Sequence, residues 1–247
     1  MFALNGQVAL VTGAGQGVGA GVARALAARG AVVAVNDLDP DRAAATVAAI
    51  GGHAFAAAFD VSDANAVAAG LQTVTATAGP VDVLVNNAGK GGQHGIGRSL
   101  FRSSGPQHWD APLAVDYRGV LHCTRAVINE MCERGWGRVV SVASDAGTIG
   151  MPIGVSAYGA AKGAVIALMR HLAVEIGGSG VTANTIALGH MEGSADSAYR
   201  DSIRARVPAG RLGLPDDVGA LCVYLASTEA AWMTGQTIHL NGGEITS

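Results

Sequence analysis

Short apolar runs alternate with alanine-rich helical segments along this chain, and this alternation restricts the fold more than any other feature of the sequence. Residues 8–11 form the first apolar run, and the segment 17–29 that follows carries apolar residues at helical spacing. The pairing recurs down to a last apolar run at 237–240. Strands that alternate with helices, without hairpin turns, are typical of a parallel sheet with helices on both faces. The pattern predicts an α/β fold of this kind.

The ends of the expected elements follow from the periodicity and from Gly, Pro and Asp at the segment boundaries. The predicted strands span 8–11, 31–35, 53–59, 81–85, 138–143, 181–187 and 237–240. The predicted helices span 17–29, 40–50, 62–78, 109–134, 156–177 and 215–226. Two stretches lack a clear period, an irregular loop over 90–107 and a polar region with some helix over 189–208. No shift in composition marks a linker, so residues 1–247 are expected to form one domain.

Composition excludes several classes of protein. Charged residues make up 14% and hydrophobic residues 49% of the chain, a balance that excludes disorder. The formal net charge of −3, without a basic run, predicts neither a nucleic-acid partner nor attraction to an anionic membrane. Neither the three cysteines nor the seven histidines show the spacing of a metal site. No metal is therefore expected. The chain also shows no leader pattern and no apolar run of about 18 residues, so the protein is expected to be cytoplasmic.

Tyr158 and Lys162 stand four residues apart in the predicted helix 156–177, so they share one helical face. A free phenol is a poor proton carrier at neutral pH, and an ammonium one turn away stabilises the phenolate. The pair is therefore a candidate general acid and base. Only two of the sixteen basic residues are lysines, Lys90 and Lys162, which sets this position apart in an arginine-rich chain. The alternative is an ordinary solvated pair of side chains on a helix.

The segment 12–19, Thr-Gly-Ala-Gly-Gln-Gly-Val-Gly, joins the first predicted strand to the first predicted helix. Glycines there let a phosphate approach the backbone, and the helix N-terminus supplies oriented N–H groups. A tight turn needs glycine in any case, so the acid at the end of the second strand is the stronger evidence for a dinucleotide site. Asp37 could accept both ribose hydroxyls of NAD, or it could simply cap a helix. It would repel the 2′-phosphate of NADP, and neither Gln16 nor Leu38 offers a compensating cation, so NAD is the expected cofactor.

Further segments make the chain resemble the short-chain dehydrogenase/reductase family from Gly6 to Gly243. The matching segments are TGAGQGVG at 12–19, Asp60-Val61, NNAG at 86–89, Ser144, YGAAK at 158–162 and the C-terminal GRLGLPDDVG…LAS…TGQTIHLNGG. Each is weak alone, but their order makes the set specific. The resemblance implies a Rossmann-like, doubly wound sheet and hydride transfer between a nicotinamide and a carbonyl or alcohol group. It also implies a homotetramer or a homodimer.

The resemblance assigns roles to individual residues. Beside Asp37 at the ribose hydroxyls, the residues expected to bind the cofactor are Gly13, Gln16, Gly17, Val18 and Gly19 at the phosphates and ribose, Asp60 and Val61 at the adenine, and Asn87, Ala88 and Gly89 at the border of the ribose. The alternative for 86–89 is a turn that only ends the strand. Ser144 would hydrogen-bond the substrate oxygen, Tyr158 would exchange its proton, and Lys162 would hold the nicotinamide ribose. Ser141 is a nearby competitor of Ser144, which could instead cap a loop.

One departure from the family pattern lies before the serine strand. Asp116 stands where the family often has an asparagine whose backbone carbonyl holds a water near the lysine. A carboxylate that points inward would change the electric field near Lys162, so Asp116 joins the catalytic candidates as a hypothesis. The alternative is that Arg118 engages Asp116 at the surface.

A second departure follows the sixth predicted strand, where Leu188 replaces the usual proline. Gly193 aligns with the threonine that usually meets the carboxamide, and Ser194 is its candidate substitute. The two aperiodic stretches are the expected substrate loops, in which His94 and His190 could touch substrate, although lone histidines are more often ordinary loop residues. The small residues of the Tyr158 helix could pack against another subunit or within the chain; they are Gly159, Ala160, Gly163 and Ala167.

Together these features predict an NAD-dependent oxidoreductase acting on a secondary alcohol or ketone, with Tyr158 as general acid and base assisted by Lys162 and Ser144. The C-terminal half resembles 3-oxoacyl-acyl carrier protein reductases, but Asp37 fits those NADP-preferring enzymes poorly. A cyclic or acyclic secondary alcohol, a polyol and a 3-hydroxyacyl thioester stay open as substrates, as does the direction. The alternatives are an NAD(H)-binding sensor or assembly subunit without turnover, and a methyltransferase, which would have no use for the Tyr158/Lys162 pair.

Overall fold

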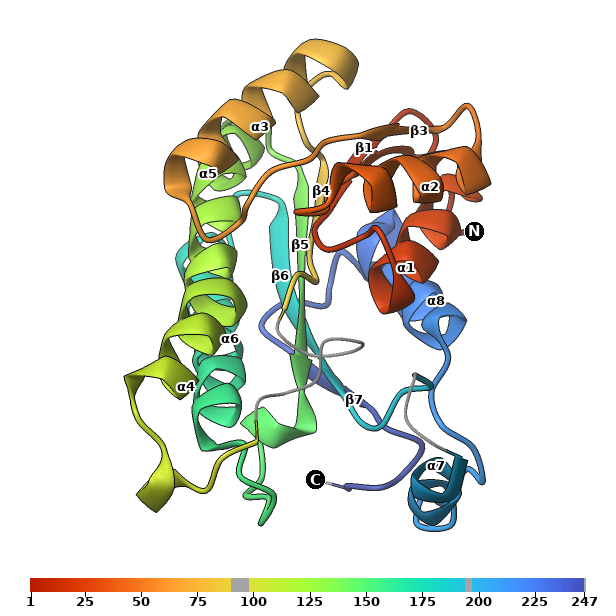
Figure 1. Ribbon diagram of the computed structural model, residues 1–247. Helices are drawn as coiled ribbons and strands as arrows, with labels where there is room; N and C mark the ends of the chain where they lie inside the picture. Colours follow the sequence, from red (N-terminus) through yellow and green to blue (C-terminus); the bar gives the residue numbers. More distant parts are fainter. Residues whose placement is uncertain (90–97, 194–196, 247) are drawn as a thin grey trace.

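The computed structural model of the protein describes residues 1–89, 98–193 and 197–246 (Figure 1). Within these residues, seven parallel strands form one sheet in the order β3-β2-β1-β4-β5-β6-β7. The strands are β1 Val8–Val11, β2 Val32–Val35, β3 Ala54–Ala56, β4 Val83–Asn86, β5 Gly137–Ser144, β6 Val181–Leu188 and β7 Thr237–Leu240. The prediction of a Rossmann-like, doubly wound parallel sheet is confirmed.

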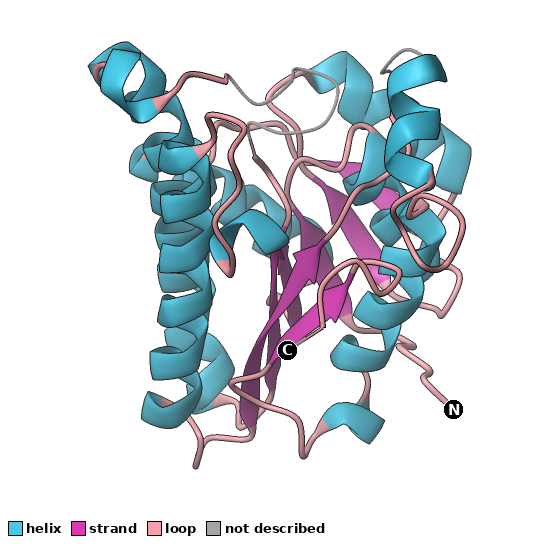
Figure 2. Cartoon of the chain, turned by 90° about the horizontal axis from the view of Figure 1, so that it is seen from below, coloured by secondary structure: helices cyan, strands magenta, loops and turns pink. Residues whose placement is uncertain are grey.

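Helices cover both faces of the sheet (Figures 1 and 2). On one face lie α1 Gly17–Ala27, α2 Pro40–Ile50 and α8 Pro215–Ala226; on the other lie α3 Ala64–Ala78, α5 Gly119–Glu133 and α6 Ser156–Glu175. Each face has its own apolar core, and β1 serves both. Ala9 and Val11 lie in the first core and Val8 and Leu10 in the second, because successive strand residues point to opposite faces.

The strand order places a switch point at the middle of the sheet. The chain builds β1, β2 and β3 toward one edge and then crosses back, so that β4 pairs with the other side of β1. In open α/β sheets, ligands bind in the crevice outside the carboxyl ends of the strands at such a point. The glycine-rich turn after β1 and the NNAG segment after β4 both lie there.

The segment predicted as one helix over 109–134 differs most from expectation. It comprises α4 Pro106–Pro112, a π-helical stretch Leu113–Arg118 and then α5. Pro112 lacks an N–H, so a regular hydrogen-bond ladder cannot continue through it, and the wider turns follow directly. This irregular stretch carries Asp116 into the interior.

The first expected substrate loop, 90–107, contains more secondary structure in its described part than the sequence predicted. Phe101–Ser103 forms a 3-10 turn ahead of α4, and α7 Ser197–Arg204 supplies the helix expected in the second. Lys90, His94 and Ser194, singled out above, lie outside the described residues. No helix in the described parts of the chain is long and apolar enough to cross a membrane.

Candidate active site

The turn from β1 to α1 lies in close contact with the segment after β4. Gly13 has a φ of +62°, and a Cβ added there would lie 2.8 Å from Ala88 Cα. A Cβ on Gly19 would overlap the Gly13 carbonyl oxygen and Asn87 Nδ2. Asn87 fixes this contact, because its Nδ2 donates to the carbonyl oxygens of Thr12 (2.9 Å) and Gly13 (3.0 Å). Both glycines are thus required by the close approach of two sheet-end segments.

The N-terminus of α1 is available to an anion. Within the described chain, the N-cap residue Gln16 makes no side-chain hydrogen bond to the first turn. The first N–H groups of a helix have no intrahelical acceptor. Gly17 has a φ of +54°, and a Cβ there would meet no described atom within 4 Å. An uncapped helix N-terminus beside open space fits the phosphates of a dinucleotide, which is the role predicted for residues 13–19.

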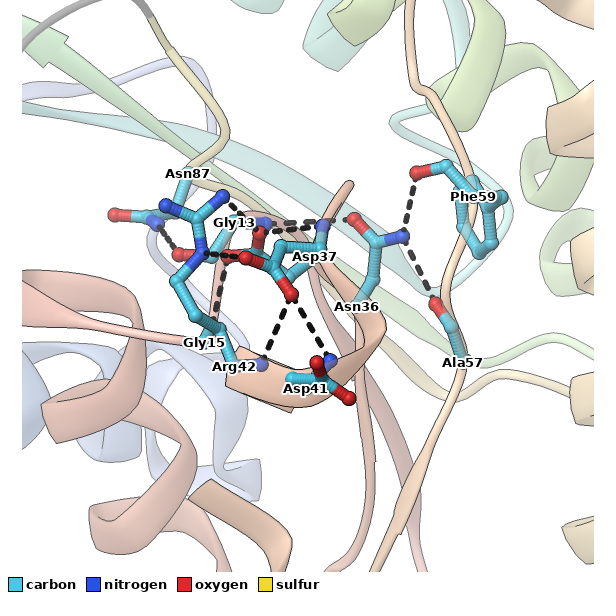
Figure 3. Close-up of polar contacts among 10 residues, drawn as sticks. Gly13, Gly15, Asn36, Asp37, Asp41, Arg42, Ala57, Phe59 and Asn87 are labelled. Atoms are coloured by element: carbon cyan, nitrogen blue, oxygen red, sulfur yellow. Dashed lines mark hydrogen bonds and ion pairs between the residues drawn. The ribbon is translucent and has the colours of Figure 1, made fainter. Parts of the chain in front are cut away.

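Asp37 lies just beyond β2, against the glycine turn, with 7% of its side chain exposed. Its Oδ2 accepts the N–H of Gly15 at 3.1 Å, and its Oδ1 accepts the N–H of Asp39 at 3.0 Å. Oδ1 also pairs with Arg42 Nη2 at 3.0 Å (Figure 3). The sequence analysis looked for a cation next to the glycines and next to Asp37, and it missed this one, which the first turn of α2 supplies. Asp37 therefore does not stand alone as a negative charge.

Asn36, which the sequence analysis passed over, connects three segments of the same edge. Its Nδ2 donates to the carbonyl oxygens of Ala57 (2.9 Å) and Phe59 (3.0 Å), and its Oδ1 accepts the N–H of Gly13 at 3.4 Å (Figure 3). The residue is buried. An asparagine directly before the predicted ribose acid was the available signal, because a buried amide requires several partners.

The residues expected at the adenine follow β3 in a turn. Asp60 Oδ1 accepts the N–H of Ser62 at 2.8 Å and its hydroxyl at 2.7 Å, which caps the turn before α3. Val61 is buried, its carbonyl oxygen lies 3.0 Å from His122 Nδ1, and a Cβ on Gly119 would lie 2.8 Å from Val61 Cγ2. The glycine thus allows α5 to approach this turn closely.

The two serine candidates of β5 have different surroundings. Ser141 is fully buried, and its Oγ accepts a hydrogen bond from Asn86 Nδ2 at 3.2 Å. Ser144 is half-buried at the end of the strand, and its Oγ accepts the N–H of Ala146 at 3.2 Å. Ser144 therefore does cap a loop, as the alternative reading held. Its hydroxyl hydrogen can still be donated, whereas Ser141 lies inside the core.

Tyr158 and Lys162 lie in the first two turns of α6, and both are buried. Lys162 Nζ lies 5.7 Å from the centroid of the Tyr158 ring and donates to the carbonyl oxygen of Val142 at 3.1 Å. Nζ also pairs with Asp116 Oδ1 at 3.1 Å. Burial alone would lower the pKa of Lys162, but the charges of Asp116 and Tyr158 and the hydrogen bond to Asp116 raise it above its usual value. The pair is not a solvated surface pair, and its lysine is an ammonium at neutral pH.

Asp116 points inward. It has no exposed surface, and the alternative in which Arg118 engages it at the surface is wrong, since its carboxylate faces Lys162. A Cβ on Gly89 would lie 2.6 Å from Asp116 Oδ1 and 3.4 Å from Lys162 Nζ. The segment after β4 thus passes directly over the ion pair, which brings the last residue of the NNAG motif to the catalytic candidates.

The residue after Ser144 was missed by the sequence analysis. Asp145 is buried, its Oδ1 lies 2.7 Å from His239 Nδ1, and its Oδ2 accepts Asn241 Nδ2 at 2.9 Å. His190, a candidate substrate contact, lies 2.7 Å from Glu244 through Nδ1. The C-terminal segment therefore bonds to the ends of both β5 and β6. No local pattern could have shown this, because the partners are 94 and 96 residues from Asp145.

The small face of α6 divides between two environments. A Cβ on Gly159 would lie 2.6 Å from the carbonyl oxygen of Ala146, and one on Gly163 would lie 3.2 Å from that of Gly147. These two glycines serve packing within the chain, which was one of the two alternatives. Ala160 is exposed, as is Ala167.

A small pocket opens beside Tyr158. It is also lined by Ser99, Ser104, His108, Trp109, Pro112 and residues 154–157. Trp109 Nε1 donates to Ser104 Oγ at 2.9 Å, and the Trp109 ring stacks on Phe101. The described part of the pocket wall is therefore rich in hydroxyl and aromatic N–H groups.

Comparison with known proteins gives matches over almost the whole chain. A family model described as enoyl-(acyl carrier protein) reductase matches residues 13–244. The chain is 37% identical over 245 residues to a 3-oxoacyl-(acyl-carrier-protein) reductase from Vibrio harveyi, covering 97% of this chain and 98% of the relative. It is 38% identical over 253 residues to a D-threitol dehydrogenase from Mycolicibacterium smegmatis, covering 98% and 94%. A crystal structure of a gluconate 5-dehydrogenase from Burkholderia cenocepacia in complex with NADP and tartrate superposes with a TM-score of 0.90, 33% identity and coverage of 98% and 96%.

Proposed function

Because the chain belongs to the short-chain dehydrogenase/reductase family of oxidoreductases, we propose that it transfers a hydride between NAD(H) and a secondary alcohol or ketone. Its catalytic residues are Tyr158, Lys162 and Ser144, with Asp116 behind the lysine. One observation carries this proposal: a buried ammonium, Lys162, is held by Asp116 beside the Tyr158 ring. Such an arrangement is costly in the interior of a protein, and it suits proton exchange at the phenol.

The catalytic residues divide the work of moving one proton. A bound nicotinamide dinucleotide accepts the hydride in oxidation and supplies it in reduction. In oxidation, the Tyr158 oxygen takes the proton of the substrate hydroxyl while Ser144 Oγ donates a hydrogen bond to the same substrate oxygen. Lys162 stays an ammonium because its pKa is raised, and its charge stabilises the phenolate. In reduction, the phenol returns the proton.

The cofactor site is supported by groups on three strand ends. The uncapped N-terminus of α1 suits the phosphates, and residues 87–89 border the adjoining edge. Asp37 suits the two hydroxyls of an NAD ribose, since a carboxylate accepts from both. The neighbouring structure that holds NADP supports a nicotinamide dinucleotide in the same fold.

We favour a small polyol or hydroxy acid as substrate. The described wall of the Tyr158 pocket carries Ser99, Ser104 and His108, whose side chains can hydrogen-bond substrate hydroxyls, whereas the indole N–H of Trp109 is already donated to Ser104 Oγ. The relative named for D-threitol and the neighbour that holds tartrate point to the same class. A 3-hydroxyacyl thioester is the second candidate, because the Vibrio harveyi relative is named as a 3-oxoacyl-(acyl-carrier-protein) reductase.

The same proposal includes a single-domain, cytoplasmic homo-oligomer, a tetramer or a dimer, as is usual in the family. The exposed Ala160 and Ala167 of α6 leave a smooth helical face on which a second copy can pack. Light scattering after size-exclusion chromatography would measure the mass directly, and a monomer at micromolar concentration would contradict this part.

The test is to titrate the protein with NADH by fluorescence and to follow NADH absorbance with D-threitol, gluconate, other secondary alcohols and a 3-oxoacyl thioester. Turnover of any one of them is expected. Tyr158→Phe should lower kcat by about 10²–10⁴ and leave the Kd for NADH within a factor of two. If Tyr158→Phe keeps its turnover, Tyr158 is not the acid–base group. Tight NADH binding without turnover of any substrate would favour the sensor or assembly subunit instead.

A further inference from the structure

We infer that Arg42 is a specificity residue of the cofactor site, which allows that site to take NADP(H) as well as NAD(H). This deepens the proposed function and rests on it, since both require a dinucleotide on the glycine turn. The expectation from sequence was that Asp37 would reject a 2′-phosphate unopposed. The cation found beside it changes that expectation.

Arg42 is held directly at the predicted ribose site. Its Nη2 lies 3.0 Å from Asp37 Oδ1 and its Nε lies 3.4 Å from Asp39 Oδ2. The start of its side chain packs over the glycine turn, because a Cβ on Gly15 would lie 2.7 Å from Arg42 Cβ and 2.6 Å from Asp37 Oδ2 (Figure 3). One glycine thus accommodates both the carboxylate and the arginine.

Arg42 is the more exposed partner of this pair, although its Nε is buried. Arg42 exposes 32% of its side chain, whereas Asp37 exposes 7%. A ligand that approaches the end of β2 from solvent therefore meets a positive group together with the carboxylate. The attraction between the Arg42 guanidinium and a phosphate offsets the repulsion between that phosphate and the Asp37 carboxylate at close range.

The local helix does not explain why an arginine stands here. Arg42 is the third residue of α2, where the helix dipole favours anions and disfavours cations. Asp39 already caps this helix by accepting the N–H groups of Asp41 and Arg42. A cation in the first turn is therefore tolerated because of its carboxylate partners, and its position relative to Asp37 is the feature that needs a role.

The two cofactors would use this pair differently. With NAD, Asp37 accepts the ribose hydroxyls and stays paired with Arg42. With NADP, the 2′-phosphate replaces Asp37 as the partner of the guanidinium, because phosphate and carboxylate both match its planar fork of donors. Asp37 keeps the N–H groups of Gly15 and Asp39 as partners in that state. Its remaining charge keeps NAD the preferred cofactor.

The experiment measures Kd for NADH and for NADPH by fluorescence at fixed ionic strength, without any substrate. The wild-type protein is expected to bind both, with Kd values within about tenfold of each other. Arg42→Leu should weaken NADPH by about tenfold or more and NADH by less than about threefold, since only the phosphate loses a charged partner. Asp37→Asn should move the ratio the other way. Arg24→Leu, which removes an arginine from α1, is the matched control and should change neither Kd.

The outcomes separate this inference from the proposed function. If the wild-type protein binds neither dinucleotide, the proposed function itself is overturned. If NADH binds but Arg42→Leu leaves the ratio of the two Kd values unchanged, or weakens NADH more than NADPH, Arg42 only orients Asp37 and this inference is overturned. Thermal unfolding of each variant without ligand shows that a loss of binding is not a loss of folding.

Discussion

The two halves of the sheet offer different chemistry at one edge. At the ends of β1, β2 and β4 the edge is made of glycines, backbone N–H groups and amide side chains, and Arg42, which pairs with Asp37 and Asp39, is partly open to solvent. At the ends of β5 and β6 the pair Lys162–Asp116 and the carboxylate of Asp145 are buried, whereas the His190–Glu244 pair is partly exposed. A ligand can be bound by groups whose charge never changes. Moving a proton requires ionisable groups, and these need partners when water is excluded.

The comparison also separates two ways in which residues become indispensable. On the cofactor side, Gly13 and Gly19 matter because no side chain fits between the touching turns. On the catalytic side, Asp116 matters because its negative charge keeps Lys162 protonated, whereas burial alone would lower the pKa of Lys162. The first kind of loss is steric and the second is electrostatic, so different substitutions should reveal them.

Asp116→Ala is expected to have the largest effect on stability. It leaves the Lys162 ammonium buried without its carboxylate, a change that costs about 3–5 kcal/mol of unfolding free energy. Urea unfolding at pH 7 measures the loss. The double variant Asp116→Leu/Lys162→Met should recover most of it, because both charges are then gone. An Asp116→Ala protein within about 1 kcal/mol of wild type would show that water or deprotonation relieves Lys162.

The pH dependence of this pair has a definite sign. The pKa of folded Lys162 is raised above its usual 10.5, so its stabilising contribution is present below pH 10.5 and is lost as the pH rises through the folded value. The stability of the wild type relative to the double variant Asp116→Leu/Lys162→Met should therefore begin to fall on the alkaline side only above pH 10.5. In Asp116→Ala, burial lowers the pKa of Lys162, so that variant should instead gain stability as the pH rises through the lowered value. A loss of the wild-type contribution between pH 7 and 9 would contradict this assignment.

Gly13→Ala and Gly17→Ala form a matched pair on the cofactor side. Both glycines have positive φ, +62° and +54°, so alanine costs about 1–2 kcal/mol of backbone strain at each. At Gly13 the new Cβ also meets Ala88, which adds about 1–3 kcal/mol of overpacking, whereas at Gly17 it meets no described atom. In urea unfolding, Gly13→Ala should have a lower free energy of unfolding than Gly17→Ala. Equal losses would mean that the segment after β4 moves aside freely.

Asp145→Asn tests the connection of the C-terminal segment to Ser144. The amide keeps an acceptor toward Asn241 but loses the charged partner of His239, which should cost about 1–2 kcal/mol. The Kd for NADH should stay unchanged, because the cofactor half of the edge is untouched. Glu244→Gln, at the more exposed His190 pair, is the control and should cost less. A change in NADH affinity would break the separation between the two halves.

Arg211→Gln should give the smallest change, because its partner Asp217 lies at the surface. The Arg211 guanidinium and the N–H of Leu214 hold the pKa of Asp217 at about 2. A lowered carboxyl pKa contributes stability above its usual 3.8 that disappears as the pH falls through about 2. The small deficit of Arg211→Gln should vanish in acid, and thermal unfolding at pH 7 and near pH 2 measures it. A loss as large as that of Asp116→Ala would contradict the distinction between exposed and buried pairs.

The sequence alone determined whatever depends on neighbours within a few residues. Alternating periods predicted the parallel sheet, and glycine spacing located the turn after β1. The four-residue interval placed Tyr158 and Lys162 on one helical face. These predictions succeeded because side-chain directions repeat every three to four residues in a helix and every two residues in a strand. Arg42 was within this range, five residues from Asp37, and was missed because only immediate neighbours were searched for a cation.

Only the tertiary structure decided which distant groups share the interior. Asp116 meets Lys162 because a π-helical stretch turns it inward and α6 packs against that stretch. Asp145 meets His239 and Asn241 because β6 lies between β5 and β7 in the sheet, so that three strand ends converge. Local periodicity fixes the face on which a side chain lies, but the strand order and the crossovers fix what lies opposite it. The free-energy cost of burying a charged side chain depends on the groups that lie opposite it, and therefore on the strand order and the crossovers.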